Sequence, residues 1–195
     1  MNKSSISSKS SQARNEMLDA IHDHYSQPLL MGIINRTPDS FSDGGQLYDF
    51  EDPDHLNAAL ERIEIMVAAG ASIIDIGGES TRPGAVRVTA AEEAQRILPL
   101  LRELCKLDNC WISVDTQRAG IAQAAIDIGA HLINDVSAGL NDPQMFNILA
   151  KEKIPTVLMH MQGRPDNMQT NPEYQDVCQE VFDFLIARKN LLLKK

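Results

Sequence analysis

Two loops hold most of the side chains in this sequence that could bind an anion or a divalent metal. The first, NRTPDSFSDGG at residues 35–45, contains Asn35, Asp39 and Asp43. These residues offer the hard oxygen ligands that suit Mg²⁺ when the ion is shared with a phosphate group. Phe41 stands among polar neighbours, which indicates that its ring covers something. The alternative is a solvated surface loop with no ligand.

The second loop, GGESTRPGA at residues 77–85, has the features of an anion-binding segment. Its glycines let the backbone approach an anion closely, Thr81 can donate to a phosphate oxygen, and Arg82 presents a planar fork to phosphate or carboxylate. Neither a GxGxxG nor a Walker pattern occurs, so a nucleotide cofactor is not indicated. Loops of this composition are common in unrelated proteins, and an ordinary turn is the alternative.

Two further polar residues, Asp115 and Asn134, follow short apolar runs. A carboxylate and an amide on an apolar rim can pair with a heterocycle that presents alternating donors and acceptors. Asp115 could instead cap the helix that follows it. His160 lies between two methionines, where a histidine is more often structural, so we do not count it as catalytic.

Strand-length apolar runs alternate with amphipathic stretches of helical spacing. The runs are 29–34, 72–76, 111–114, 131–133 and 156–159, and the helical stretches are 56–67, 94–101, 121–128 and 145–149. Expected helix N-caps are Asp54, Thr89, Thr116 and Asp142. Strand-then-helix repetition predicts an α/β fold with a parallel sheet, either doubly wound or a (β/α)₈ TIM barrel.

A polar residue at the carboxyl end of every run favours the barrel, because those ends build its active face. These residues are Asn35, Asp75, Asp115, Asn134 with Asp135, and His160. Helix caps and turns would explain any one of them separately.

Composition excludes some classes of protein. The chain has 195 residues with 27 acidic and 18 basic side chains, a formal net charge of −9 that argues against a nucleic-acid surface. No apolar run approaches the roughly 20 residues of a membrane helix. Three cysteines without a C-x-x-C pair indicate free thiols and a cytoplasmic location. Residues 1–27 are expected to form an N-terminal tail that has room for a lead-in helix, although a transit peptide has a similar composition. Residues 28–195 are expected to form a partial barrel domain.

Together these segments resemble the dihydropteroate synthase family, the folate-biosynthesis enzymes that sulfonamides inhibit. The resemblance rests on MGIINRTPDSFSDGG, IIDIGGESTRPGA, ISVDT, LINDVSA and TVLMHMQGRPDNMQ, which occur in the family's order. It implies a (β/α)₈ barrel, truncated here after about five β/α units. It also implies condensation of p-aminobenzoate with 6-hydroxymethyl-7,8-dihydropterin diphosphate, with Mg²⁺ on the diphosphate.

The resemblance also implies roles for individual residues. Asn35 would be the metal ligand and Thr81 the diphosphate contact, while Asp115 and Asn134 would bind the pterin ring. The residues that would close over the diphosphate and form the aminobenzoate pocket are Phe41, Asp43, Arg82 and Pro83. Asp115, Asn35 and Arg82 form the expected catalytic set.

Two features depart from the family pattern. Arg36 stands where the family has a small apolar residue, and its guanidinium could either contact the diphosphate or obstruct loop closure. The chain also lacks the family's later Asp-Pro-Gly, Ser-x-Lys and Arg-x-His segments, so we expect little or no synthase activity from these 195 residues alone. Dimerisation, which is frequent in the family, cannot be carried over.

Two other functions stay open. The chain could be a truncated pterin-binding remnant without catalysis. It could also be a methyltetrahydrofolate-type methyltransferase, which shares the pterin-binding Asp and Asn, but TPDSFSDGG and ESTRPG favour the synthase.

Overall fold

A parallel sheet carries the fold. The computed structural model describes residues 3–23, 28–37, 53–80, 87–164 and 167–195. Its strands pair in sequence order, all parallel, and are β1 (Leu30–Asn35), β2 (Ala71–Gly77), β3 (Trp111–Asp115), β4 (Leu132–Asp135) and β5 (Thr156–Leu158). The predicted α/β class and all five strands are confirmed.

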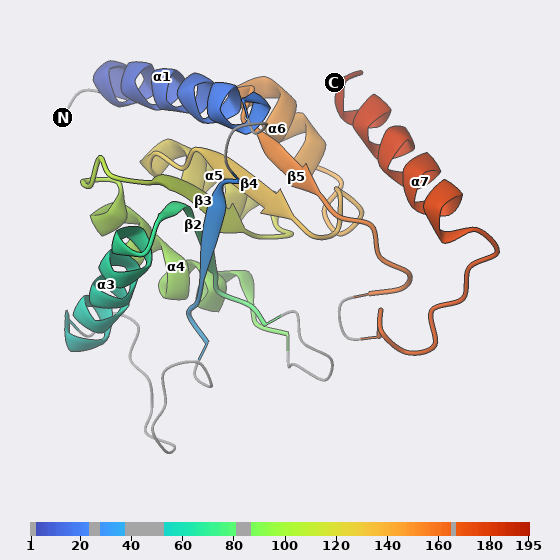
Figure 1. The fold of residues 1–195 in the computed structure, drawn as a ribbon, viewed down its shortest axis with the longest axis horizontal. Coiled ribbons are helices and arrows are strands. Elements are labelled where there is room, and N and C mark those ends of the chain that lie inside the picture. The colour runs from blue at the N-terminus through green and yellow to red at the C-terminus, as the bar shows by residue number, and fades with distance from the viewer. Residues whose placement is uncertain (1–2, 24–27, 38–52, 81–86, 165–166) are drawn as a thin grey trace.

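Four helices, α3 to α6, follow the first four strands as the amphipathic stretches predict, whereas α1 and α7 at the two ends of the chain lie outside those stretches (Figure 1). They are α1 (Lys3–His22), α3 (Pro53–Ala68), α4 (Ala90–Leu104), α5 (Ala119–Ile128), α6 (Met145–Glu152) and α7 (Val177–Leu192). Successive helices α3 to α6 pack against one another, as expected when each crossover returns to the next parallel strand.

One face of the sheet is covered by these helices. Its side chains come from alternate residues of each strand and are 0–1% exposed: Ile34, Ile74, Ile76, Ile112, Val114 and Ile133. Helix residues such as Ile97, Leu101 and Ala122 complete the same hydrophobic core.

The opposite face of the sheet carries polar side chains. Asn35 pairs with Gly77, Gly77 with Asp115 and Asp115 with Asn134, so these four form one row across the carboxyl ends of four strands. In the part of the chain that the structure describes, this face also leaves aliphatic side chains uncovered, with Ile33 56% exposed.

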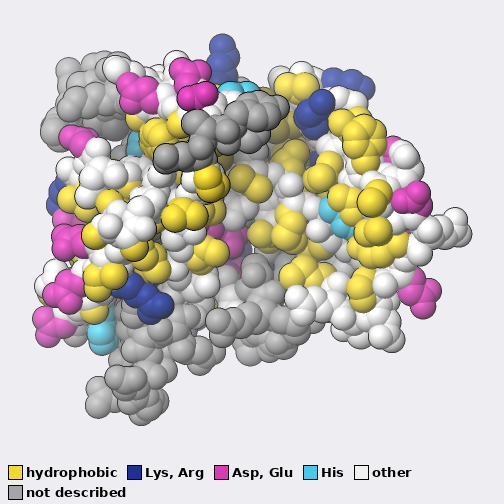
Figure 2. All heavy atoms as spheres, viewed as in Figure 1, with side chains coloured by type: hydrophobic (Ala, Val, Ile, Leu, Met, Phe, Trp, Pro, Cys, Tyr) yellow, Lys and Arg dark blue, Asp and Glu magenta, His cyan; other side chains and the backbone are white. Residues whose placement is uncertain are grey.

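Helix α1 lies across the amino ends of the later strands. Arg14 donates from Nη2 to the carbonyl of Ala130 at 3.2 Å and from Nη1 to that of Glu152 at 3.4 Å, and Met17 is fully buried. At the other end of the chain, α7 leaves several apolar side chains exposed, including Phe182 at 59%, and hydrophobic side chains are visible over it in Figure 2.

The predicted helix caps are partly wrong. Thr89 is the N-cap of α4 and forms a capping box with Glu92, as expected. Asp54 lies within the first turn of α3, and the residues that precede α5 and α6 are Arg118 and Gln144. The Thr116 hydroxyl instead accepts from the N–H of Arg118, and Asp142 accepts from the N–H groups of Gln144 and of Ala119, the first residue of α5. A local sequence pattern does not distinguish these contacts from capping of the next helix.

Two predictions from composition can be compared with the structure. All three cysteines are free thiols. Among the residues described, no helix has the length and apolar character needed to cross a membrane.

Candidate functional site

The row of polar residues at the carboxyl ends of the strands is the candidate site. Gly77 separates Asn35 from Asp115, and the space is tight: a Cβ atom at Gly77 would lie 2.9 Å from Asn35 Oδ1 and 3.7 Å from Asp115 Oδ2. Only glycine therefore lets both side chains share the rim. The structure thus brings together Asn35, Asp115 and Asn134, which the sequence placed far apart.

Asp75 supports this row from within the sheet, one layer below. It pairs in register with Ser113 and is 4% exposed, and its Oδ2 accepts a hydrogen bond of 3.2 Å from Asn134 Nδ2. This contact fixes the orientation of the Asn134 amide, so that its oxygen remains an acceptor for a ligand. The sequence marked Asp75 only as a polar residue near a strand end, and its partner could not be inferred from one chain.

The site is strongly acidic and poorly solvated. Burial, and after it the nearby charges of Asp75, Glu93, Asp135 and Glu79, together raise the pKa of Asp115 to about 8. Burial also raises the pKa of Asp75, opposed by the Ser113 hydroxyl and the Asn134 amide. A ligand that offers N–H donors or partial positive charge would be favoured here.

Asp135 lies beneath the same rim, and its contacts are local. Its carboxylate accepts from the backbone N–H of Ser137 at 2.9 Å, from the Ser137 hydroxyl at 2.7 Å and from the N–H of Gly139 at 2.6 Å. It is fully buried and organises the turn after β4. Burial raises the pKa of Asp135, and its charge contributes to the raised pKa of Asp115.

An ion cluster lies beside the rim, between the second loop and α5. Arg118 donates from Nη1 to Glu79 at 2.6 Å and also contacts the Glu93 carboxylate. Burial raises the pKa of Glu93, whose side chain is only 1% exposed, so the neighbouring guanidinium is needed to balance its charge. Sequence reasoning missed this cluster, because its members are separated by up to 39 residues.

Several predicted site residues cannot be placed. Phe41, Asp43, Thr81, Arg82 and Pro83 lie outside the described residues, as does the alternative metal ligand at position 39.

Arg36, the departure from the family pattern, has a definite position. Its side chain is fully buried, and its backbone N–H donates to the carbonyl of Gly77 at 2.7 Å. The guanidinium is therefore not a solvent-exposed loop cation.

His160 is held by aromatic neighbours. Its ring is 4.9 Å from that of Phe184 in an edge-to-face arrangement and 5.8 Å from that of Tyr174. This packing against α7 favours the structural role expected for it.

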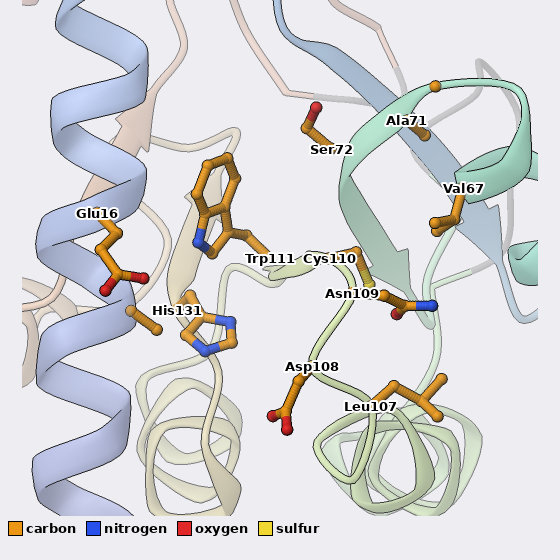
Figure 3. A pocket seen from close by; sticks show the side chains of 12 residues that line it. Glu16, Val67, Ala71, Ser72, Leu107, Asp108, Asn109, Cys110, Trp111 and His131 are labelled. Carbon is orange, nitrogen blue, oxygen red and sulfur yellow. The ribbon is translucent and has the colours of Figure 1, made fainter.

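A cavity of about 590 Å³ lies at the opposite end of the sheet, between α1 and the start of β3 (Figure 3). Glu16, Trp111 and His131 line it, and Figure 3 shows both rings on the side that faces α1. His131 already accepts a hydrogen bond from the Ile112 N–H through Nδ1 at 3.0 Å, and burial lowers its pKa. None of the residues lining the cavity belongs to the rim.

The chain is similar in sequence and fold to pterin-binding enzymes. The sequence profile described as "pterin binding enzyme" matches residues 31–195. The dihydropteroate synthase of Haemophilus influenzae is 44% identical over 178 residues. The crystal structure of the Yersinia pestis dihydropteroate synthase with a sulfonamide drug superimposes with a TM-score of 0.77 at 42% identity and covers 87% of this chain. The Xanthomonas albilineans synthase with 4-aminobenzoic acid gives 0.74 at 40% identity over 86% of the chain.

These relatives are longer than the chain. The aligned region covers 91% of the chain but 60% of the Haemophilus influenzae protein, and 59% and 56% of the Yersinia pestis and Xanthomonas albilineans chains. The chain therefore spans about three fifths of the length of each of these synthases.

Proposed function

The chain belongs to the pterin-binding enzyme family, and on that basis we propose that the protein acts as a dihydropteroate synthase. The amine nitrogen of p-aminobenzoate forms a bond to the methylene carbon of 6-hydroxymethyl-7,8-dihydropterin diphosphate. The carbon–oxygen bond breaks, its electron pair leaves with pyrophosphate, and the amine releases one proton. The product is 7,8-dihydropteroate, an intermediate of folate biosynthesis.

The observation that carries this proposal is the row formed by Asn35, Asp115 and Asn134 on one rim. A pterin ring presents an edge of N–H donors and an acceptor, which matches a carboxylate beside an amide oxygen. Because burial and the neighbouring acids raise the pKa of Asp115 to about 8, its carboxylate form gains from binding N–H groups that replace lost water.

Asp115 also suits the developing charge of the reaction. Loss of the diphosphate leaves positive charge on the pterin methylene, and the ring delocalises it. The acidic rim, in which Asp75 and Asp135 lie close enough to act on Asp115, provides negative potential near that charge. Asp115 therefore both orients the ring and stabilises the transition state.

The diphosphate would lie near Asn35 at the end of β1. In the part of the chain that is described, no cluster of three or more His, Cys, Asp or Glu could hold a metal ion. Asn35, whose amide oxygen lies at the rim, would hold Mg²⁺ together with the diphosphate. When bound, the ion neutralises charge on the leaving group.

The other substrate contacts are assigned through the family pattern. We assign Thr81 and Arg82 to the diphosphate, and Phe41, Asp43, Arg82 and Pro83 to the p-aminobenzoate pocket. The complex of the Xanthomonas albilineans relative with 4-aminobenzoic acid supports the second substrate. Because an aniline nitrogen is a weak nucleophile, alignment of the two substrates contributes more than a strong base. Three free thiols support a cytoplasmic location.

The test is formation of 7,8-dihydropteroate by the protein purified from its native source, followed by mass spectrometry, because little or no turnover is expected from these 195 residues alone. We expect product that depends on Mg²⁺ and on p-aminobenzoate, and that a sulfonamide reduces. Methyltetrahydrofolate serves as the control ligand, since preferential binding of it would favour the methyltransferase alternative. Binding of the dihydropterin without turnover would overturn the synthase assignment in favour of a non-catalytic pterin-binding chain.

A further inference from the structure

A buried carboxylate of α4 contacts the turn that follows β3. Glu93 lies in the first turn of α4, and its side chain is only 1% exposed. The Thr116 hydroxyl hydrogen-bonds to this carboxylate, and Arg118 donates to it from Nη1. Both partners belong to the turn between β3 and α5. Glu93 therefore joins this turn to a helix that packs into the core.

Thr116 connects the contact to the rim. Its hydroxyl also accepts from the Arg118 N–H at 3.2 Å, so its single proton is available to donate to the Glu93 carboxylate. The Thr116 N–H donates to the carbonyl of Asn134 at 3.1 Å, and the residue is 3% exposed. Thr116 therefore lies directly after Asp115 in the chain and is bonded to Asn134, the two residues assigned to the pterin ring.

Helix α4 is held in a fixed position against the end of β2. Arg96 Nη1 donates to the Gly78 carbonyl at 2.9 Å. A Cβ atom at Gly78 would lie 2.9 Å from Ile97 Cγ2 and 3.2 Å from Glu93 Cγ, so the helix and this backbone are in direct contact. Ile97 is fully buried. The first turns of α4 therefore give Glu93 a constant position relative to the rim.

The position of Asp115 depends on the turn as well as on the strand, because Asp115 is the last residue of β3. Its backbone is held by the sheet before it and by the turn after it. Two side chains that bind one ring together, such as Asp115 and Asn134, must keep a constant separation. A displacement of about 1 Å in such an arrangement can reduce the rate about 100-fold.

We propose that Glu93 is a positioning residue, which holds the turn after β3 through Thr116 and Arg118 and so keeps the Asp115 carboxylate in place for the pterin ring. This inference rests on the proposed synthase function. Glu93 acts through its two partners in the turn, and for that reason it does not join the catalytic set.

Position and charge predict opposite effects when the Glu93 carboxylate is removed. The charge of Glu93 contributes to the raised pKa of Asp115. Loss of that charge alone would favour the carboxylate form of Asp115 and strengthen its binding of N–H donors. Loss of support for the turn would weaken the same binding. The direction of the change in affinity therefore distinguishes a positioning role from an electrostatic one.

The experiment measures the Kd of 6-hydroxymethyl-7,8-dihydropterin by calorimetry and the KM of p-aminobenzoate at saturating dihydropterin diphosphate. Each variant is introduced in the native source and the full protein is purified from it. Glu93→Gln keeps the shape of the side chain but loses hydrogen bonds to a charged group, so we expect the Kd to rise about 10-fold. The KM of p-aminobenzoate should stay nearly unchanged, whereas a general loss of structure would alter both values.

Three further variants control the design. Thr116→Val removes the hydroxyl without changing any charge and should raise the Kd about fivefold. Thr116→Ser keeps the hydroxyl and should leave the Kd nearly unchanged. Glu92→Gln is the same substitution at the exposed neighbouring position, where glutamine also suits the capping box, and it should change neither value. If Glu93→Gln fails to fold, the two Thr116 variants test the same contact.

Each outcome decides between the alternatives. Unchanged or tighter binding of the dihydropterin in Glu93→Gln and Thr116→Val would overturn the role of Glu93 and leave the synthase assignment intact. Equal losses in Thr116→Val and Thr116→Ser would also overturn it, because the hydroxyl would then have no effect. Weaker binding in Glu93→Gln and Thr116→Val, with no product from the unsubstituted protein, would support the role and overturn the synthase assignment. No binding by the unsubstituted protein would overturn both.

Discussion

The two faces of the sheet carry different kinds of side chain. On the helix-covered face, Ile34, Ile74 and Ile112 are 0–1% exposed and pack into a continuous core. On the other face the same strands carry Asp75, Asp115 and Ser113, and Ile33 is 56% exposed. Because side chains alternate along a strand, adjacent residues differ completely in environment. The helix-covered face therefore provides most of the stability, and the other face carries the residues of the candidate site.

The polar face is a source of instability at neutral pH. Burial raises the pKa of both Asp75 and Asp115, which means that folding disfavours their charged forms. Burying an isoleucine on the covered face stabilises the fold by about 1.5–3 kcal/mol, so several such residues offset this cost. Substitutions on the covered face should therefore mainly lower the free energy of unfolding, and substitutions on the polar face should mainly lower activity.

The largest effect on stability should come from the covered face. Ile34→Ala removes three methyl or methylene groups from a position 1% exposed and should lower the free energy of unfolding by about 3 kcal/mol. Urea denaturation of the variant measures this directly. A loss below about 1 kcal/mol would mean that the core relaxes around the cavity and that the covered face is less closely packed than the structure indicates.

Asp115→Asn should have the largest effect on activity. The substitution keeps the shape of the side chain but removes its ability to become a carboxylate when the N–H groups of the ring bind, so kcat/KM should fall about 100-fold, or roughly 2.7 kcal/mol. The fold should persist, as thermal denaturation would show. Activity within threefold of the unsubstituted protein would remove Asp115 from the catalytic set.

The same variant should also remove the contribution of Asp115 to the pH dependence of stability. The pKa of Asp115 is raised to about 8 from an ordinary value of 3.8, so the protonated form is favoured in the fold. Its stabilising contribution is complete below pH 3.8 and is lost as pH rises to about 8. Asp115→Asn should therefore be more stable than the parent at pH 8, by roughly 2 kcal/mol, with the difference shrinking toward pH 4. A difference independent of pH would contradict the raised pKa.

A smaller effect should follow from changing Asp75, which acts through Asn134. Asp75→Asn replaces an acceptor with a group that can also present N–H, so the Asn134 amide loses its fixed orientation. We expect kcat/KM to fall about 10-fold, or roughly 1.4 kcal/mol, mainly through KM for the dihydropterin. Asp127→Asn, the same substitution at an exposed position of α5, is the matched control and should preserve KM.

Sequence patterns predicted the covered face better than the polar one. Apolar runs and helical spacing located every described strand and the helices between them, because burial imposes a period on the sequence. They also identified Asn35, Asp115 and Asn134 as strand-end residues that would meet, which the register confirms. That inference needs only the rule that parallel strands present their carboxyl ends at one edge.

Contacts between distant residues could not be predicted in this way. The bond between Asp75 and Asn134 joins residues 59 apart, and that between Arg118 and Glu79 joins residues 39 apart. Nothing local distinguishes Arg118 from a solvated helix-start arginine, or Arg36 from an exposed loop cation. Their burial depends on how loops cross the rim, which is a tertiary property.

The smallest effect should come from Ile33, and it is the sharpest test of the comparison. Ile33 and Ile34 are the same residue type in the same strand, but Ile33 is 56% exposed and Ile34 is 1% exposed. Ile33→Ala should change the free energy of unfolding by less than about 0.5 kcal/mol, because little apolar surface is removed from contact. β-Propensity and backbone position are nearly matched in the two variants, so the difference between Ile33→Ala and Ile34→Ala isolates burial by the helices. The two losses of unfolding free energy are measured in the same urea titration. Equal losses would mean that both faces of β1 are covered in solution. The polar rim would then be enclosed on the side that the described residues leave open.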